Sequence, residues 1–148
     1  MRISAKGRYA LAALIQIANK NNTAEPVPII SISETLGVSK IFLEQVATAL
    51  KKNGLITAVK GAKGGYQLAR NPADITALAV LKSVENGLFE TTQTDSLEQS
   101  PVIAGALSDL VFTPLDKAVE DCLSGITLQA LVEYTLSHGD SQSFMLYI

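Results

Sequence analysis

The chain has 148 residues, 47% of them apolar, with a mean hydropathy of +0.25 and a net charge of −2, which suits one compact domain. No stretch approaches the roughly 18 uninterrupted apolar residues of a membrane span, and the N-terminus lacks a signal-peptide pattern, so a cytoplasmic protein without membrane contact is expected. Cys122 and His138, the single cysteine and histidine, exclude an internal disulfide and leave too few soft ligands for a zinc or iron–sulfur site made by one chain.

The small net charge conceals an uneven distribution along the chain. Residues 1–70 carry ten Lys and Arg against three Asp and Glu, a net charge of +7, whereas residues 71–148 carry two against eleven, a net charge of −9. This asymmetry indicates a basic half that meets phosphate groups and an acidic half that stays away from them. Chance segregation of solvated charges is the alternative.

The opening residues, MRISAKGRYALAALIQIANK, predict a basic arm followed by a helix that is apolar on more than one side. Such a helix is expected to be buried on two sides, against its own domain or against a second subunit. A polar connector with two prolines, residues 21–28, follows.

Residues 29–54 have the spacing of two short helices that cross at a glycine turn. Counting from Ile29, small residues stand at positions five and nine, where the helices approach and the turn favours a left-handed backbone; these are Ser33 and Gly37. Apolar residues fill the positions that should share a core: Ile32, Leu36, Val38, Leu43 and Val46. The spacing predicts a helix-turn-helix, with an ordinary helical hairpin as the alternative.

The ends of these two helices are less sharply defined by the sequence. The first helix begins near Pro28 or at Ser31, where a capping-box spacing occurs, and the pattern does not choose between them. The second helix is expected over residues 40–52, ended by a left-handed cap at Asn53-Gly54.

Two short strands, residues 55–59 and 66–69, are predicted on either side of the tip KGAKGG. This glycine-rich, cationic hairpin is a wing that can approach a sugar–phosphate backbone closely. A nucleotide-binding loop is disfavoured, because the tip lacks the GxxxxGK[ST] spacing and does not lead into a helix.

Beyond the wing the sequence predicts helices and one loop. Thr76 caps a short helix with Val80, Leu81 and Val84 on one side, stopped by Asn86-Gly87. Residues 88–101 predict a loop and residues 102–111 a helix, and Thr113-Pro114 has the form of a helix start or a kink.

A regular apolar stripe then predicts a helix that pairs along its length, as a dimerisation seam would. Its members are Leu115, Ala118, Val119, Cys122 and Leu123. Packing on the same domain is the alternative. Gly125 ends this helix, and Thr127 caps another whose inward residues are expected to be Leu128, Leu131, Val132 and Leu136. The last apolar residues are too few to assign.

Five segments resemble one known family: MRISAKGRYALAAL, FLEQV, LKKNGLI, VKGAKGGYQLAR and SGITLQALV. In order and over nearly the whole chain, they are similar to the Rrf-two family of winged helix-turn-helix transcriptional regulators. The resemblance implies a mainly α fold with a small β-wing, and a bacterial DNA-binding homodimer, expected to be a repressor. Residues 1–85 would form the DNA-binding domain, 86–101 a loop and 102–148 a helical dimerisation region. Recognition helices would enter major grooves of a palindromic operator, with wings in adjacent minor grooves.

The resemblance also implies which residues contact DNA. It assigns Ser39, Phe42, Glu44 and Gln45 on the recognition helix, Lys60 in the wing, and Arg2, Lys6 and Arg8 near the backbone. Outward positions and the wing tip add Lys40, Lys51, Lys63, Gly64, Gly65 and Tyr66. Glu44 can accept from a cytosine amino group and Gln45 can bond adenine, although both could be merely solvated helix residues. Ile41 replaces a small polar residue common in the family.

The largest departure from the family lies in the loop, where cluster-binding relatives carry three cysteines and this chain has none. Cys122 sits on the apolar stripe, where a packing thiol is expected. The chain therefore resembles the clusterless, CymR-like branch, and no cofactor is expected. By the same resemblance, an enzyme of cysteine synthesis is a candidate regulatory partner.

A protein of another class is the second hypothesis: an interaction module that retains the fold and docks partners on its acidic C-terminal half. The location of the basic residues on recognition helix, wing and N-terminal arm favours DNA binding instead. An enzyme is not expected, because no nucleophile, base and orienting group can be assembled.

Overall fold

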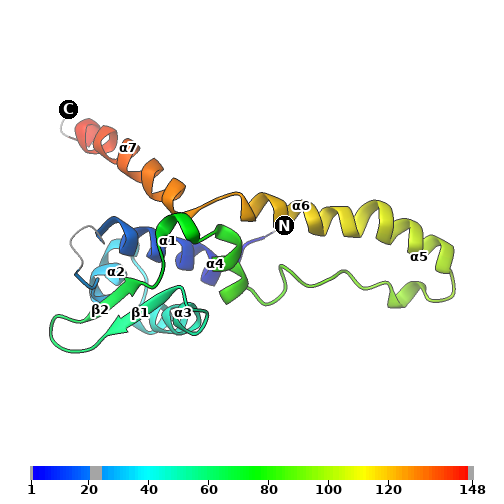
Figure 1. The fold of residues 1–148 in the computed structure, drawn as a ribbon, viewed down its shortest axis with the longest axis horizontal. Coiled ribbons are helices and arrows are strands. Elements are labelled where there is room, and N and C mark those ends of the chain that lie inside the picture. The colour runs from blue at the N-terminus through cyan, green and yellow to red at the C-terminus, as the bar shows by residue number, and fades with distance from the viewer. Residues whose placement is uncertain (1, 21–24, 147–148) are drawn as a thin grey trace.

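Helix α1 (Ala5–Lys20) lies at the centre of the molecule, where it contacts α2 (Ile29–Leu36), α3 (Lys40–Lys52), α4 (Ala77–Val84), α7 (Leu128–Leu146) and the wing (Figure 1). The computed structural model describes residues 2–20 and 25–146. The predicted connector therefore lies partly outside the described residues. Ala10, Ala13, Leu14 and Ile17 of α1 are all buried, as a helix covered on more than one side requires.

The close approach of α1 to α4 depends on Gly7. A β-carbon at this position would clash with the side chains of Ile3, Leu81 and Glu85. The Ser4 hydroxyl accepts a hydrogen bond from the Gly7 N–H (3.1 Å), and it donates to Glu85 Oε1 (2.8 Å). The Ser4 N–H donates to the same oxygen (2.8 Å), so the start of α1 is fixed to the end of α4.

Helices α2 and α3 form the predicted helix-turn-helix. Ile32, Leu43 and Val46 are buried between them and α1, and Gly37 adopts the expected left-handed conformation (φ 67°). Of the two predicted starts of α2, the one near Pro28 is confirmed, because Pro28 is the N-cap residue. The start at Ser31 is wrong, since the N–H of Ser31 already bonds the Pro28 carbonyl within the first turn.

Helix α3 spans Lys40–Lys52 and ends at Asn53-Gly54, as predicted. Asn53 has an ordinary backbone (φ −93°) and Gly54 alone is left-handed (φ 73°). Strands β1 (Ile56–Val59) and β2 (Gly65–Leu68) pair antiparallel, with Ile56 opposite Leu68 and Val59 opposite Gly65. Strand β1 is one residue shorter than predicted, and β2 begins and ends one residue earlier than predicted. The register of the pairing sets these limits.

The C-terminal half consists of helices around a loop. The Thr76 hydroxyl caps α4 by accepting from Ala79 N–H (3.1 Å), as predicted, and α4 ends at Val84, with Glu85 as its C-cap just before Asn86-Gly87. The predicted loop contains one short 3-10 turn, Asp95–Leu97. Helix α5 (Pro101–Leu107) then continues through a π-helical segment, Ser108–Phe112, into α6 (Thr113–Ser124).

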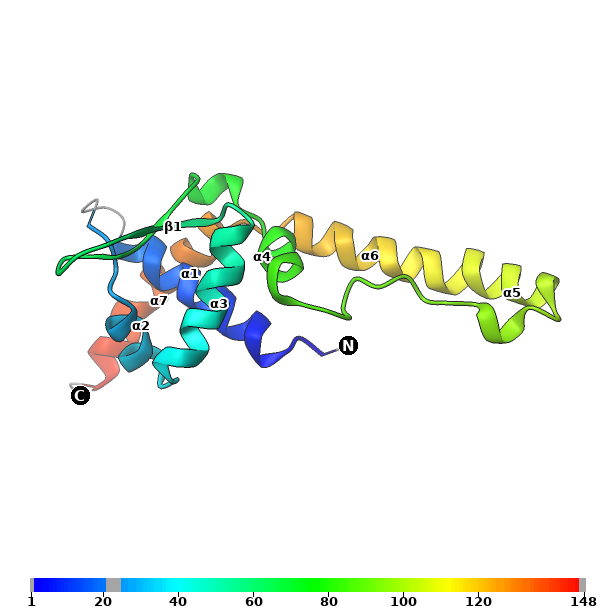
Figure 2. The same cartoon turned by 90° about the horizontal axis from the view of Figure 1, so that it is seen from below.

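The helix thus widens into a π-helical turn directly before Thr113-Pro114. Pro114 has no N–H to donate to the carbonyl of Leu110, and its ring crowds that carbonyl, so a π turn just before it relieves both problems. The resulting rod of α5 and α6 projects from the domain on the side away from the wing (Figure 2).

Helix α7 returns to the domain and packs on α1. The backbone of residues 75–77 pairs with that of residues 126–128, through Ala77 N–H to Ile126 O and Leu128 N–H to Ile75 O, both 2.8 Å. Leu128 and Val132 are buried, but Leu136 is 57% exposed, so the prediction of Leu136 as an inward residue is wrong. The apolar spacing in the sequence continues to Leu136, but α7 no longer packs on the domain at that residue. None of the described helices combines the length and apolar content that a membrane span requires.

Candidate nucleic-acid interface

Helix α3 buries one face in the core and presents the other to solvent. Leu43, Val46, Ala47 and Leu50 are buried. The exposed residues recur at the spacing of a single helix face: Lys40, Ile41, Glu44, Gln45, Thr48, Lys51 and Lys52. Four of them, Lys40, Glu44, Gln45 and Lys51, are among the predicted DNA contacts. Three further residues of this face were not predicted as DNA contacts: Ile41, Thr48 and Lys52. The helical spacing that places Lys40, Glu44, Gln45 and Lys51 on this face also places these three there.

The first turn of α3 is organised around Ser39. This residue is the N-cap, and its hydroxyl accepts a hydrogen bond from the Phe42 N–H (3.1 Å). The Phe42 ring is half-buried and meets the Tyr9 ring edge to face, with centroids 5.6 Å apart. Ser39 and Phe42 are both predicted DNA contacts. In the structure, both residues help to fix the start of α3. The Ser39 side chain remains exposed, whereas much of the Phe42 ring is packed against Tyr9.

Lys40 stands in the first turn of α3, where the helix dipole disfavours a cation, and that turn holds no acidic residue. Its ammonium lies 3.9 Å from Glu44 Oε1 in an exposed i,i+4 pair. Such a pair contributes only about 0.3–0.5 kcal/mol. Stability therefore does not account for Lys40, whereas a phosphate at a helix N-terminus would be stabilised by both the ammonium and the free N–H groups.

The wing tip, residues 60–64, is a short loop that depends on two glycines. Gly61 has a positive φ (108°), and a β-carbon on Gly64 would clash with the carbonyl of Val59 across the loop. Lys60 and Lys63 are both exposed at this tip. The loop thus presents two cations, and the residues between them, Gly61 and Ala62, are small and exposed.

The base of the wing is attached to the connector before α2. Val27 and Tyr66 exchange two backbone hydrogen bonds of 2.9 Å, so Val27 acts as a single-residue third strand. A β-carbon on Gly65 would overlap the Val27 backbone. Gly65 was predicted as a DNA contact, and the structure shows that it permits this close pairing.

The Tyr66 side chain connects the wing to the recognition helix electrostatically. Partial burial raises the pKa of its phenol, and the negative charge of Glu44 raises it further. The hydroxyl therefore stays protonated and able to donate a hydrogen bond at any physiological pH. A groove of about 450 Å³ lies between the wing and the starts of α2 and α3; Ile30, Lys40, Val59 and Tyr66 are among its lining residues.

The N-terminal arm carries the remaining predicted cations, Arg2, Lys6 and Arg8, which are all exposed. Arg8 donates a hydrogen bond to the Ile3 carbonyl (3.4 Å). The contacts of Ser4 with Gly7 and Glu85 hold the arm at the start of α1, a role that the sequence pattern did not predict. Gly7, between Lys6 and Arg8, is explained by the close approach of Ile3 and of the α4 side chains described above.

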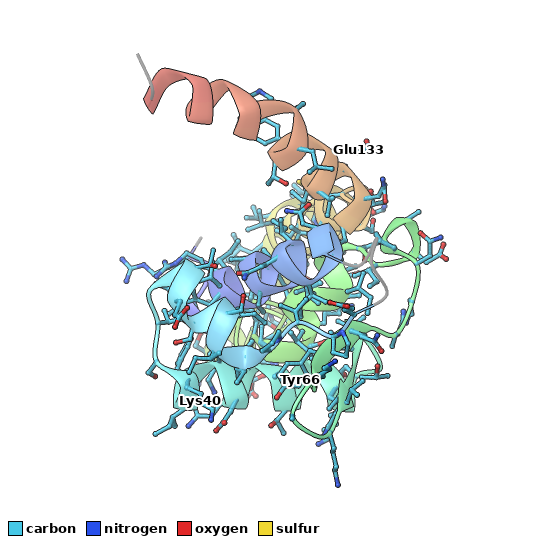
Figure 3. The ribbon with its side chains drawn as sticks, turned by 90° about the vertical axis from the view of Figure 1, so that its left-hand side faces the viewer. Lys40, Tyr66 and Glu133 are labelled. Carbon is cyan, nitrogen blue, oxygen red and sulfur yellow. The ribbon has the colours of Figure 1, made fainter. Side chains whose placement is uncertain are left out.

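Helix α3 and the wing lie together on one side of the domain, the lower side in Figure 1, and the N-terminal arm leaves the domain at the level of α1. In Figure 2, α3 faces the viewer, with the wing extending to one side. Figure 3 shows Lys40 and Tyr66 on this edge, whereas Glu133 of α7 lies away from them, toward the opposite side. An exposed helix face beside a cationic loop has the arrangement needed to meet a major groove and the neighbouring phosphate backbone.

The predicted seam lies on the rod, away from this surface. Leu115, Ala118 and Cys122 are exposed, and Val119 and Leu123 are half-buried. Ala118, Val119, Cys122 and Leu123 line an apolar groove of about 250 Å³ together with Ile3 and Leu88. The inner end of the rod is held to the domain by an ion pair between Lys82 and Glu120 (3.2 Å).

A helix-turn-helix followed by a two-stranded wing defines the protein as a winged-helix DNA-binding protein. The comparisons with known proteins agree. Residues 3–134 match the sequence profile of the Rrf2 family, described as "Iron-dependent Transcriptional regulator". The chain is 35% identical over 132 residues to the HTH-type transcriptional regulator IscR of Pectobacterium atrosepticum, covering 89% of this chain and 79% of that protein.

Solved structures show the same fold. The global cysteine regulator CymR of B. subtilis superposes with a TM-score of 0.77 at 30% identity, covering 91% of this chain and 98% of that one. IscR of T. potens superposes with a TM-score of 0.70 at 30% identity, covering 91% and 88%. The chain belongs to the Rrf2 family of bacterial transcriptional regulators.

The donor atoms of this chain do not fit an iron–sulfur cluster, although the family is described as iron-dependent. A cluster needs about four protein ligands, mostly thiolates, and the chain offers one cysteine and one histidine. Among the described residues, no group of three His, Cys, Asp or Glu is arranged to hold a metal ion. A cavity of about 620 Å³ beside the start of the loop is lined by Arg2 and by four carboxylates, Glu85, Glu90, Asp116 and Glu120, without a thiol or imidazole.

Proposed function

We propose that the protein is a sequence-specific repressor that binds a palindromic operator as a homodimer in the bacterial cytoplasm. The observation that carries the proposal is that the exposed face of α3 and the cationic wing tip lie on the same side of the domain (Figures 1 and 2). Contacts of this kind to DNA would block other proteins from the same stretch of promoter. Glu44 and Gln45 would read base edges, and the lysines and arginines would hold phosphates.

The dimer is proposed from the surface of the rod. Its exposed apolar side chains include Val102 (86% exposed), Leu110 (78%) and Leu115 (55%). Exposed apolar side chains gathered on one projecting element are unfavourable in water unless another surface covers them. The rod of a second copy, lying along the α6 groove, would cover it and relate the two recognition helices by a two-fold axis.

Regulation is proposed to be independent of an iron–sulfur cluster, because the donor set does not fit one. Protein purified without oxygen should then be colourless and contain no stoichiometric iron. Visible cluster absorbance that disappears in Cys122→Ala would contradict this proposal. An enzyme of cysteine synthesis stays a candidate partner, supported by the similarity to CymR, a cysteine regulator in B. subtilis.

The DNA-binding proposal is tested by selection from randomised duplexes with the full-length protein, followed by fluorescence anisotropy. A two-fold related motif should emerge, bound far more tightly than a scrambled duplex. Gln45→Ala should relax the preference at one base pair per half-site and leave nonspecific affinity nearly intact. Failure to enrich any motif would contradict the proposed function. A reporter gene placed behind the selected motif then separates repression from activation.

A further inference from the structure

We infer that Ile41 reads the C5 methyl group of a thymine and thereby fixes one base pair of the operator; the inference rests on the proposed DNA binding. Ile41 is 71% exposed on α3. It is the only apolar side chain among the exposed residues of this helix, all of which the structure describes.

The position of Ile41 is that of a base-reading residue. It is the second residue of α3, and residues near the N-terminus of a recognition helix contact base edges. Glu44 and Gln45 follow at i+3 and i+4, so the three side chains are neighbours on one helix face. Ile41 therefore shares the surface on which the two polar readers lie.

Folding gives no reason for isoleucine at this position. The side chain is 71% exposed, and a β-branched residue has a lower helix propensity than the Lys, Glu or Gln found at five of the six other exposed positions. A single exposed apolar residue would need no explanation elsewhere on the surface. Here it stands among the groups that would lie within a DNA groove.

The chemistry of the major groove selects the ligand. Each base pair presents hydrogen-bond donors and acceptors there, and the thymine methyl group is the one apolar feature. The Ile41 side chain cannot form a hydrogen bond, so if it covered a donor or acceptor of a base, that donor or acceptor would be desolvated and unpaired. Side chains at i and i+3 are about 5–6 Å apart, which corresponds to one or two base steps. The thymine should therefore lie within two steps of the pair that Glu44 reads.

The experiment removes single methyl groups from the DNA. In the operator obtained by selection, each thymine is replaced in turn by deoxyuridine, which differs only in lacking this methyl, and affinity is measured by anisotropy at constant salt. At one thymine per half-site the wild-type protein should bind about fourfold more weakly, the factor expected for one methyl group left in water. Ile41→Ser, with a helix propensity close to that of isoleucine, should bind both duplexes equally.

Leu136→Ser is the matched control. Leu136 is 57% exposed and lies on α7, away from the α3 surface. This variant should keep the full sensitivity to deoxyuridine. Wild-type protein that is indifferent at every thymine, sensitivity that persists in Ile41→Ser, or sensitivity lost in Leu136→Ser would each overturn the inference. These outcomes all require an operator, so they are distinct from a failure to bind DNA, which would overturn the proposed function itself.

Discussion

At the scale of single residues, the wing depends on a glycine whose constraint comes from the protein's own backbone. Gly65 lies against the carbonyl of Val27 with a φ of 155°, and the adjacent Tyr66 makes both hydrogen bonds of the pairing. Because the obstacle is main chain, a larger residue cannot be accommodated by a side-chain rotation.

Gly65→Ala should therefore destabilise the protein by roughly 1–3 kcal/mol, the range for overpacking at a site that cannot relax. Urea unfolding followed by circular dichroism measures this difference. Gly87→Ala is the control, since no atom lies within 4 Å of the added carbon, and it should leave stability within about 0.5 kcal/mol of wild type. Equal effects of the two substitutions would show that the Val27 backbone does not constrain Gly65.

Tyr66 makes a second prediction at this scale. Its folded-state pKa is raised, so the folded state holds this proton more tightly than the unfolded state. The stabilisation is fully present below the unfolded pKa of about 10 and is lost as pH rises through the folded value. The unfolding free energy of wild type should thus fall more steeply above pH 10 than that of Tyr66→Phe.

Phenolate absorbance gives an independent measurement of the same pKa. Subtracting the alkaline titration of Tyr66→Phe from that of wild type isolates Tyr66. Glu44→Gln should lower this pKa only part of the way to its usual value, because burial is the larger cause and Glu44 the smaller. A complete return to the usual value would reverse that order.

At the scale of elements, the wing is expected to act through charge and not through base recognition. Lys60 and Lys63 are exposed on a loop whose backbone is otherwise bare. Replacing both with alanine should weaken binding to all sequences and reduce the slope of log affinity against log salt by roughly 0.9 for each phosphate that is no longer neutralised. The measurement is a salt series by anisotropy on operator and random duplexes. Lys117→Ala, on α6 away from the interface, should not alter the slope.

How much of each element the sequence predicted depends on how local its determinants are. The crossing of α2 and α3 was predicted because Ser33, Gly37 and their apolar neighbours act within one short stretch. The start of α2 was not resolved, since Pro28 and Ser31 offer competing local caps and the wing pairing at Val27 decides between them. The partial burial of Phe42 was missed for the same reason: it depends on Tyr9, more than thirty residues away.

At the scale of the whole molecule, the division of charge along the chain becomes a division in space. Eight of the ten basic residues of the first half lie on α3, the wing tip, the N-terminal arm and the first turn of α1, and four of the eleven carboxylates of the second half line the cavity near the rod. Ile3 lines the groove of the predicted seam, one residue from Arg2 of the arm. A partner seated on α6 would therefore also bury the base of the arm that is proposed to contact DNA, which would link dimerisation to the position of Arg2.

The seam itself is tested by Val119→Asp. Val119 is half-buried and lines the α6 groove, so a second copy seated there would enclose an unpaired carboxylate at a cost of several kcal/mol. In a monomer the same group stays near enough to water to be solvated, and the fold should survive. Sedimentation should show a monomer, circular dichroism a native helix content, and anisotropy a loss of operator affinity. Thr113→Asp, which adds the same charge to an exposed position off the stripe, should stay dimeric. A Val119→Asp protein that remains a dimer, or one that simply unfolds, would count against α6 as the seam.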